Sequence, residues 1–186
     1  MLGAGGKGGA SRTYAVDRDA ARYFITAAAR TPGVRKFLLV SYIGSRRNRA
    51  PWFTDDDWSS IQKVNNEILP DYAKAKVDAD ECLYALARQR REQGQPFQDI
   101  VLRPGTLTEE PAKGKVSLGH TRTKGDTSRA ETAHVAVQLL DSEIRGYLDL
   151  LDGDESLDQA ISRVIKDKVD CIEGEDIDAI VKKYKL

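Results

Sequence analysis

Two side chains suited to proton transfer stand four residues apart in the segment LPDYAKAKVDADECL, namely Tyr72 and Lys76. Positions four apart in a helix share one face, so the phenol and the ammonium can point into one cleft. A nearby cation stabilises a phenolate and thereby lowers the pKa of a tyrosine, which suits Tyr72 to exchange protons near neutral pH. The alternative is a partly buried Tyr72 with a solvated Lys76 beside it, and the surrounding sequence has to separate these two interpretations.

Two short apolar runs flank this pair, and both end in residues that suit a binding site. The first, at 37–40, ends at Ser41 and is typical of a strand buried on both faces of a parallel sheet. The second, at 100–102, stops at the sequence Arg-Pro-Gly at 103–105, because proline cannot donate a ladder hydrogen bond. Ligands of open parallel sheets bind beyond the carboxyl ends of the strands, so we expect both strand ends to lie at one site.

The order of these pieces resembles an atypical short-chain dehydrogenase/reductase of the NAD(P)H-binding, nitrogen-repressor-like branch. The matching pieces cover most of the chain and are LLVSYIGS, PDYAKAK, IVLRPGTLTEEPAKGKVSLG and the helix after DTSRAE. The resemblance implies that Tyr72 donates or accepts the proton and that Ser41 orients the substrate oxygen. It implies that Lys76 binds the nicotinamide ribose and lowers the pKa of Tyr72. The backbone of Pro104 and Gly105 would then lie near the nicotinamide of NAD or NADP, with NADP preferred.

The glycine-rich stretch GAGGKGG, at positions 3–9, fits the dinucleotide pattern Gly-x-Gly-x-x-Gly, but only two residues precede it. That pattern needs a strand, a turn and a helix N-terminus together to bind a pyrophosphate. The resemblance implies instead that the stretch is the exit from the family's fourth strand, with Gly3, Ala4 and Gly5 beside the cofactor. We therefore expect an N-terminally truncated Rossmann-type domain that lacks the half with most adenosine and pyrophosphate contacts.

Helix and strand patterns alternate along the chain and predict an α/β fold, the later half of a Rossmann-like, doubly wound parallel sheet. Helices are expected at 17–30, from residue 70, from residue 129 and at 157–164, and strands at 37–40, 100–103, 114–119 and 146–151. We expect one domain over residues 1–186, with a C-terminal amphipathic tail at 167–186. In the family's strand order the missing strands belong beside the strand at 37–40. Its edge would then be unpaired, which favours weak stability or self-association through that edge.

The composition fits such a domain and excludes several classes of partner. The chain has 186 residues, of which 40% are hydrophobic and 31% charged, as in ordinary globular domains. The formal net charge is zero, which leaves no basic field for nucleic acid. No apolar run is long enough for a membrane and no signal-peptide pattern opens the chain, so a cytoplasmic location is expected. Neither the two isolated cysteines nor the acidic run at 55–57 has metal-ligand spacing, so no metal site is expected.

Several other polar and aromatic groups have two interpretations each. Ser41 either has a role in the site or only forms a local hydrogen bond through its hydroxyl at the strand end. Arg103 is either a site residue or an ordinary ion-pair partner. The arginines within 46–49 belong to a solvated loop or meet an anionic substrate. The aromatic residues within 52–58 cover the cleft as a lid or pack against the sheet.

The leading hypothesis is an NAD(P)-dependent oxidoreductase that transfers a hydride between the nicotinamide and a carbonyl or alcohol carbon of a small molecule. One alternative is a non-catalytic NAD(P)-sensing or scaffold protein, and another is an inactive fragment. The residues that choose between NAD and NADP would belong to the missing half.

Overall fold

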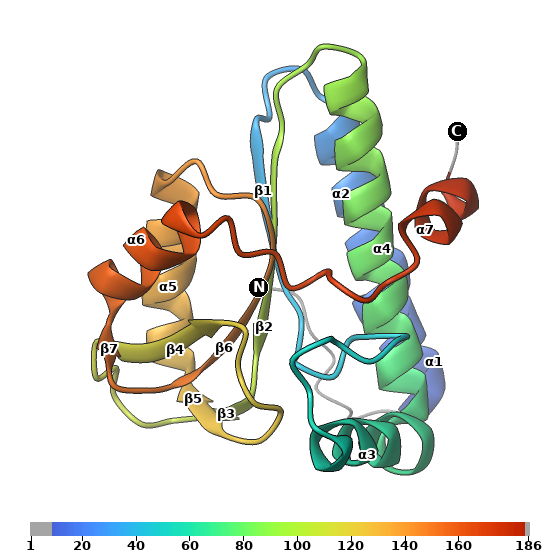
Figure 1. Ribbon diagram of the computed structural model, residues 1–186. Helices are drawn as coiled ribbons and strands as arrows, with labels where there is room; N and C mark the ends of the chain where they lie inside the picture. Colours follow the sequence, from blue (N-terminus) through green and yellow to red (C-terminus); the bar gives the residue numbers. More distant parts are fainter. Residues whose placement is uncertain (1–8, 185–186) are drawn as a thin grey trace.

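The computed structural model describes residues 9–184, which form an α/β structure with helices on both sides of a central sheet (Figure 1). Five strands form this sheet in the order β1-β2-β6-β4-β7. Three run parallel, namely β1 (Lys36–Val40), β2 (Gln98–Pro104) and β6 (Gly146–Asp152). The remaining two, β4 (Lys115–Gly119) and β7 (Glu155–Ser156), pair antiparallel to their neighbours. The predicted Rossmann-like α/β sheet is confirmed, as a mainly parallel mixed sheet.

Helices cover both faces of the sheet. On one side lie α2 (Ala21–Arg30) and α4 (Pro70–Glu92), and on the other lie α5 (Arg129–Asp141) and α6 (Leu157–Lys166) (Figure 1). Shorter pieces complete the described chain: α1 (Gly9–Thr13), η1 (Tyr14–Ala20), α3 (Asp55–Lys63), η2 (Val64–Ile68), α7 (Ile177–Lys183), and a two-stranded sheet of β3 (Thr106–Thr108) and β5 (Asp126–Ser128). None of the helices in residues 9–184 is both long and apolar enough to cross a membrane.

The alternation of side chains along β2 builds the two halves of the core. Every residue of β2 is buried. Ile100 and Leu102 pack with α5 and α6, whereas Val101 packs with α2 and α4. Successive side chains of a strand point to opposite faces, so one apolar strand can anchor both helical layers. This explains why an uninterrupted apolar run at this position predicted a fully buried strand.

Two local signals determine where the helices begin. Pro70 occupies the first turn of α4, where its missing N–H leaves no hydrogen bond unmade. Ser128 caps α5 by accepting a hydrogen bond from the backbone N–H of Glu131 at 2.9 Å. In a capping box the Glu131 carboxylate would also accept a hydrogen bond from the backbone N–H of Ser128, but here it does not. It accepts hydrogen bonds from the backbone N–H groups of Lys113 and Gly114, each at 2.7 Å, and so fixes the approach to β4.

β1 lies at the edge of the sheet, and within residues 9–184 it pairs only with β2. Its side chains are half-exposed after Lys36, unlike those of β2. A cavity of about 530 Å³ borders the open side of β1 and is lined also by residues of α2, α5 and η1. The strand predicted to be buried on both faces is therefore partly open along one side.

Candidate functional site

One face of α4 presents a polar side chain at every fourth position, Tyr72, Lys76 and Asp80. The first two were predicted from their spacing. Asp80 was not, although it continues the same helical stripe by one more turn. This stripe lies against the carboxyl ends of β1 and β2, where the sheet leads into its loops.

Lys76 is only 4% exposed, and its ammonium donates a hydrogen bond to the carbonyl of Val40 at 2.7 Å. Val40 is the last residue of β1. Burial lowers the pKa of Lys76, whereas the carboxylates of Asp80 and Asp17 favour its charged form. The structure thus places the Lys76 ammonium at the carboxyl end of β1.

Ser41 is buried, and its hydroxyl donates to Oδ2 of Asp80 at 2.7 Å. The hydroxyl of Ser45 donates to the same oxygen, also at 2.7 Å. Burial raises the pKa of Asp80, while Arg103, Lys76 and the two hydroxyls oppose that rise. No hydrogen bond between the described residues joins Ser41 to Tyr72. The serine is held by a carboxylate that sequence reasoning did not include.

Tyr72 packs against a second tyrosine, Tyr42, with ring centroids 5.0 Å apart and ring planes at 47°. Burial raises the pKa of Tyr72 above its ordinary value of 10.0, and the charges of Asp17 and Asp80 raise it further. The predicted lowering of this pKa by Lys76 is wrong for this structure. The Lys76 ammonium is hydrogen-bonded to the end of β1, and the charges that act on the phenol are carboxylates.

A cavity of about 360 Å³ adjoins the carboxyl end of β2. Apolar side chains and hydroxyls share its wall, together with one ammonium, and the lining residues are Tyr42, Ile43, Gly44, Ser60, Ile61, Val64, Pro104, Gly105, Thr106, Thr123, Lys124 and Gly125. Pro104 and Gly105 were predicted near a ligand, and the structure places both at this cavity. A Cβ on Gly105 would lie 2.4 Å from the carbonyl oxygen of Gly125, so only glycine fits there.

The outer wall of this cavity is the segment of α3 and η2, which the sequence did not predict as helical. Asp57 joins it to the opposite loop, because its Oδ1 accepts a hydrogen bond from the Thr123 hydroxyl at 2.7 Å. Partial burial alone would raise the pKa of Asp57. Hydrogen bonds from Thr123 and Thr54 stabilise the carboxylate more strongly and lower this pKa to about 2. Asp57 is thus more than a solvated charge, because it connects α3 to the loop that contains Thr123. Trp52 donates through Nε1–H to the Thr121 carbonyl at 3.1 Å, which adds a second connection to the same loop.

Two arginines in this region, Arg103 and Arg46, are buried. Arg103 is 2% exposed, stacks over the Tyr147 ring at 4.3 Å and lies 3.5 Å from Oδ2 of Asp80. Arg46 is 3% exposed and donates to the carbonyls of Cys171 and Glu173. The expectation of a solvated loop is therefore wrong for Arg46, and Arg103 is an ion-pair residue.

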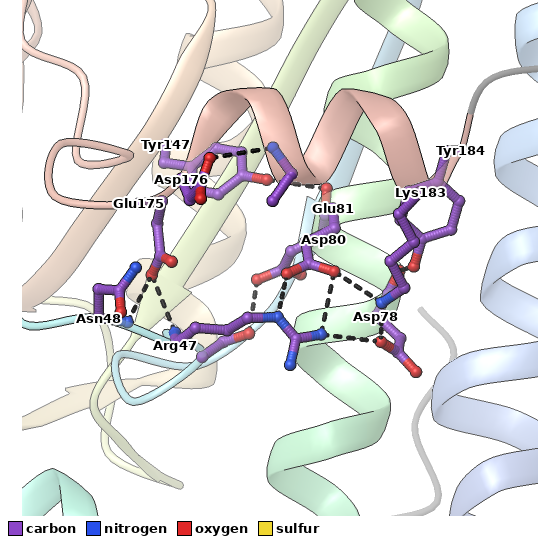
Figure 2. A network of polar contacts seen from close by, with 12 residues as sticks. Arg47, Asn48, Asp78, Asp80, Glu81, Tyr147, Glu175, Asp176, Lys183 and Tyr184 are labelled. Atoms are coloured by element: carbon purple, nitrogen blue, oxygen red, sulfur yellow. Dashed lines mark hydrogen bonds and ion pairs between the residues drawn. The ribbon is translucent and has the colours of Figure 1, made fainter.

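A second polar network ties the C-terminal segment to α4, and Figure 2 shows it. Arg47 and Lys183 both reach the carboxylates of Asp78 and Glu81, with Lys183 Nζ 2.8 Å from Glu81 Oε2. The backbone N–H of Arg47 also donates to Glu175 at 2.9 Å. These contacts fix the loop after Ser41 between α4 and the C-terminal segment.

The predicted cofactor contacts at Gly3, Ala4 and Gly5 lie outside the described residues. The structure brings Ser41 and Lys76 together around Asp80 and β1, and places Pro104 and Gly105 at the neighbouring cavity. Within residues 9–184 there is no group of three or more His, Cys, Asp or Glu side chains arranged to hold a metal ion.

Known proteins resemble this chain in sequence and in fold. YhfK of Bacillus subtilis, named as an uncharacterized sugar epimerase, is 32% identical over 165 residues, which cover 87% of this chain and 65% of that protein. A Bacillus halodurans protein named as an NAD-dependent epimerase/dehydratase has a similar fold, with a TM-score of 0.65, 24% identity and coverage of 87% of this chain and 66% of that one. The oxidoreductase ylbE from Lactococcus lactis gives a TM-score of 0.63 at 22% identity, over 88% of this chain and 65% of that one.

This chain therefore spans just under two thirds of the length of these relatives. The sequence profile of the family described as NAD(P)H-binding matches residues 2–143, which include β1, α4 and β2. The chain belongs to this NAD(P)H-binding family.

Proposed function

We propose that this chain is the substrate-side portion of an NAD(P)H-dependent oxidoreductase that reduces a carbonyl group. The observation that supports this most directly is the position of Lys76, buried one helical turn from Tyr72 and bonded to the end of β1. In Rossmann-like sheets this end of the strands is where dinucleotides bind. The family match independently supports a nicotinamide cofactor.

Lys76 fits the ribose of such a cofactor. It lines the cavity along the open side of β1, and an ammonium has three N–H donors, of which the Val40 carbonyl takes one. The other two form no hydrogen bond within residues 9–184, and in this proposal they bind ribose hydroxyls. When bound, the nicotinamide supplies the hydride.

Tyr72 supplies the proton in this proposal. Its raised pKa keeps the phenol protonated at neutral pH, which suits a donor to a substrate oxygen that gains negative charge. The same property leaves almost no Tyr72 phenolate at neutral pH to remove a proton from an alcohol. Carbonyl reduction is therefore favoured over alcohol oxidation.

The cavity beside Pro104 and Gly105 is the proposed substrate site. Its volume of about 360 Å³ suits a small molecule, and its wall combines Ile43, Ile61 and Val64 with hydroxyl groups. This lining favours a compact, largely apolar carbonyl compound.

The first test measures cofactor binding and consumption. The purified chain is titrated with NADPH and with NADH while the nicotinamide fluorescence is followed, and consumption is then measured over a panel of carbonyl compounds. We expect binding and slow consumption. Failure of both cofactors to bind would sink the proposal.

Substitution of the proton donor provides the second test. We expect Tyr72→Phe to lower turnover by about 10²- to 10⁴-fold, the usual contribution of a general acid, with cofactor binding retained. Tyr23→Phe is the matched control, because Tyr23 is 76% exposed on α2. Equal turnover in the two variants would remove Tyr72 from the mechanism.

A non-catalytic NAD(P)-sensing protein is the second candidate, and one observation favours it. The Ser41 hydroxyl is held by Asp80, and Tyr72 is not among the residues that line the cavity at 104–105. Cofactor binding without consumption over the whole panel would support this candidate.

A further inference from the structure

The tyrosine that faces the proposed substrate cavity is Tyr42. Tyr42 lines the cavity, whereas Tyr72, whose ring centroid lies 5.0 Å from that of Tyr42, is not among the lining residues. Tyr42 follows Ser41 directly, at the point where the chain leaves β1. A ligand in the cavity therefore lies against Tyr42, which in turn packs against Tyr72.

A hydrogen-bonded clamp holds Tyr42 in this position. Its hydroxyl donates to Oδ1 of Asn65 at 2.7 Å, and Nδ2 of Asn65 donates to the carbonyl of Gly44 at 2.8 Å. Asn65 belongs to η2, the outer wall of the cavity. The clamp thus connects the cavity wall to the loop after β1 through the Tyr42 ring.

The packing at Gly44 leaves this ring little freedom. A Cβ on Gly44 would lie 2.6 Å from Cε2 of Tyr42 and 3.2 Å from Oδ1 of Asn65. Contacts this close exclude a larger residue at position 44 unless the ring moves. A side chain held by ring packing and a hydrogen bond at its tip rotates only when both are disrupted.

We propose that Tyr42, clamped by Asn65, is a positioning and specificity-determining residue that separates the substrate cavity from Tyr72. Release of the Asn65 hydrogen bond and rotation of the Tyr42 ring join the cavity to the Tyr72 phenol. This inference rests on the proposed function only in giving Tyr72 a chemical role, because the barrier itself is a property of the protein without ligand. Substrates that can displace or hydrogen-bond the Tyr42 phenol are those that reach Tyr72.

Hydroxyl-radical footprinting with mass spectrometry tests the barrier without cofactor or substrate, since it reports the solvent access of single side chains. The chain contains its own references, because Tyr23 is 76% exposed and Tyr147 is 2% exposed. We expect Tyr42→Ala to increase the oxidation rate of Tyr72 several-fold, with both reference tyrosines unchanged. Tyr42→Phe keeps the ring and should preserve most of the protection.

The clamp is tested by Asn65→Ala, which removes the partner of the Tyr42 hydroxyl and leaves the ring. Asn65→Ala and Tyr42→Phe break the same hydrogen bond, so each should increase Tyr72 oxidation modestly and their combination should add little. An unchanged Tyr72 rate in Tyr42→Ala would overturn the proposal. A rise at Tyr147 equal to that at Tyr72 would also overturn it, because the substitution would then have loosened the whole fold.

These outcomes are separable from those of the proposed function. Loss of nicotinamide binding would leave the footprinting result unaffected, and a failed footprinting result would leave the cofactor titration unaffected. If both proposals hold, Tyr42→Ala should broaden the range of carbonyl compounds consumed, with a larger effect on KM than on kcat.

Discussion

Asp80 explains why the residues predicted to do chemistry are arranged differently from the expectation. A fully buried carboxylate needs partners, and it takes the hydroxyls of Ser41 and Ser45 and the charge of Arg103. The serine predicted to orient a substrate is therefore engaged in satisfying Asp80. Lys76 contributes to the same balance of charge.

Asp149 is a second buried carboxylate, and we predict that it makes stability depend on pH. It is 0% exposed on β6, and burial raises its pKa to about 6 although Arg46 and Arg103 oppose the rise. The folded state then binds a proton more tightly than the unfolded state, whose carboxyl has the ordinary value of 3.8. Stability from this group therefore falls as the pH rises from about 4 to about 6 and stays reduced above that range.

Asp149→Asn should remove this contribution. We expect the variant to be more stable relative to the natural chain at pH 7.5 than at pH 4.5, that is, to have the larger relative free energy of unfolding at pH 7.5. Urea denaturation at the two pH values measures the difference. Asp99, whose pKa burial also raises to about 6, is unchanged in both proteins and cancels in this comparison. A difference that is the same at both pH values would contradict the prediction.

At the scale of elements, α4 is the helix to which most other parts of the site are attached. Its inner stripe holds Tyr72, Lys76 and Asp80 against the strand ends, and Asp78 and Glu81 bind the loop after β1 and the C-terminal segment (Figure 2). A helix that is anchored on two sides can hold the stripe at a fixed distance from β1. The C-terminal segment at 167–184 therefore has a structural role in positioning the site.

Glu81→Gln tests this role. Glu81 is mostly buried and accepts from both Arg47 and Lys183, so loss of its charge should cost about 1.5–3 kcal/mol of stability, the usual range for hydrogen bonds to charged groups. Amide hydrogen exchange at residues 171–184 should increase. Glu92→Gln, in the exposed i,i+4 pair with Arg88, is the matched control and should cost about 0.5 kcal/mol or less. Equal effects of the two substitutions would show that the C-terminal segment is held by other contacts.

For the whole molecule, the open edge of β1 matters because it affects whether the chain associates with other chains. The amides of Ser41 and Ile43 donate to carbonyls of β2, at 2.7 and 3.0 Å. Backbone groups of a strand alternate in direction, so the N–H groups of Leu38 and Val40 point to the open side. On the same side, the Val40 carbonyl accepts a hydrogen bond from the Lys76 ammonium. A strand whose edge pairs with no other strand within residues 9–184 is a template for pairing with another chain.

We predict concentration-dependent self-association through this edge. Light scattering coupled to size-exclusion chromatography should show a mass that rises with concentration. Leu38→Pro removes an outward-facing donor without breaking the ladder to β2, and it should lower the mass toward that of one chain. Tyr23→Ser, which changes an exposed aromatic residue that does not line this cavity, should leave the mass as it is. A single-chain mass for the unsubstituted protein at all concentrations would disprove this.

The elements that could be predicted are those specified by neighbouring residues. The apolar runs of β1, β2 and β6, the proline that opens α4 and the serine that caps α5 depend on local periodicity and local backbone hydrogen bonds. α3 and η2 were missed because the apolar residues there are sparse. Part of what anchors this segment is far away in sequence: Asp57 bonds Thr123, and Asn65 bonds Tyr42.

By itself, the sequence determined the fold class, the placement of Tyr72 and Lys76 on one helical face, and the strand ends beside them. The tertiary structure decided which groups those side chains meet: Asp80 beside Ser41, Tyr42 packed against Tyr72, and carboxylates acting on the phenol in place of an ammonium. The physical reason is that helix and strand formation depends on residues a few positions apart. The pKa of a buried group and the partner of a hydroxyl depend instead on charges and dipoles brought together from across the whole chain.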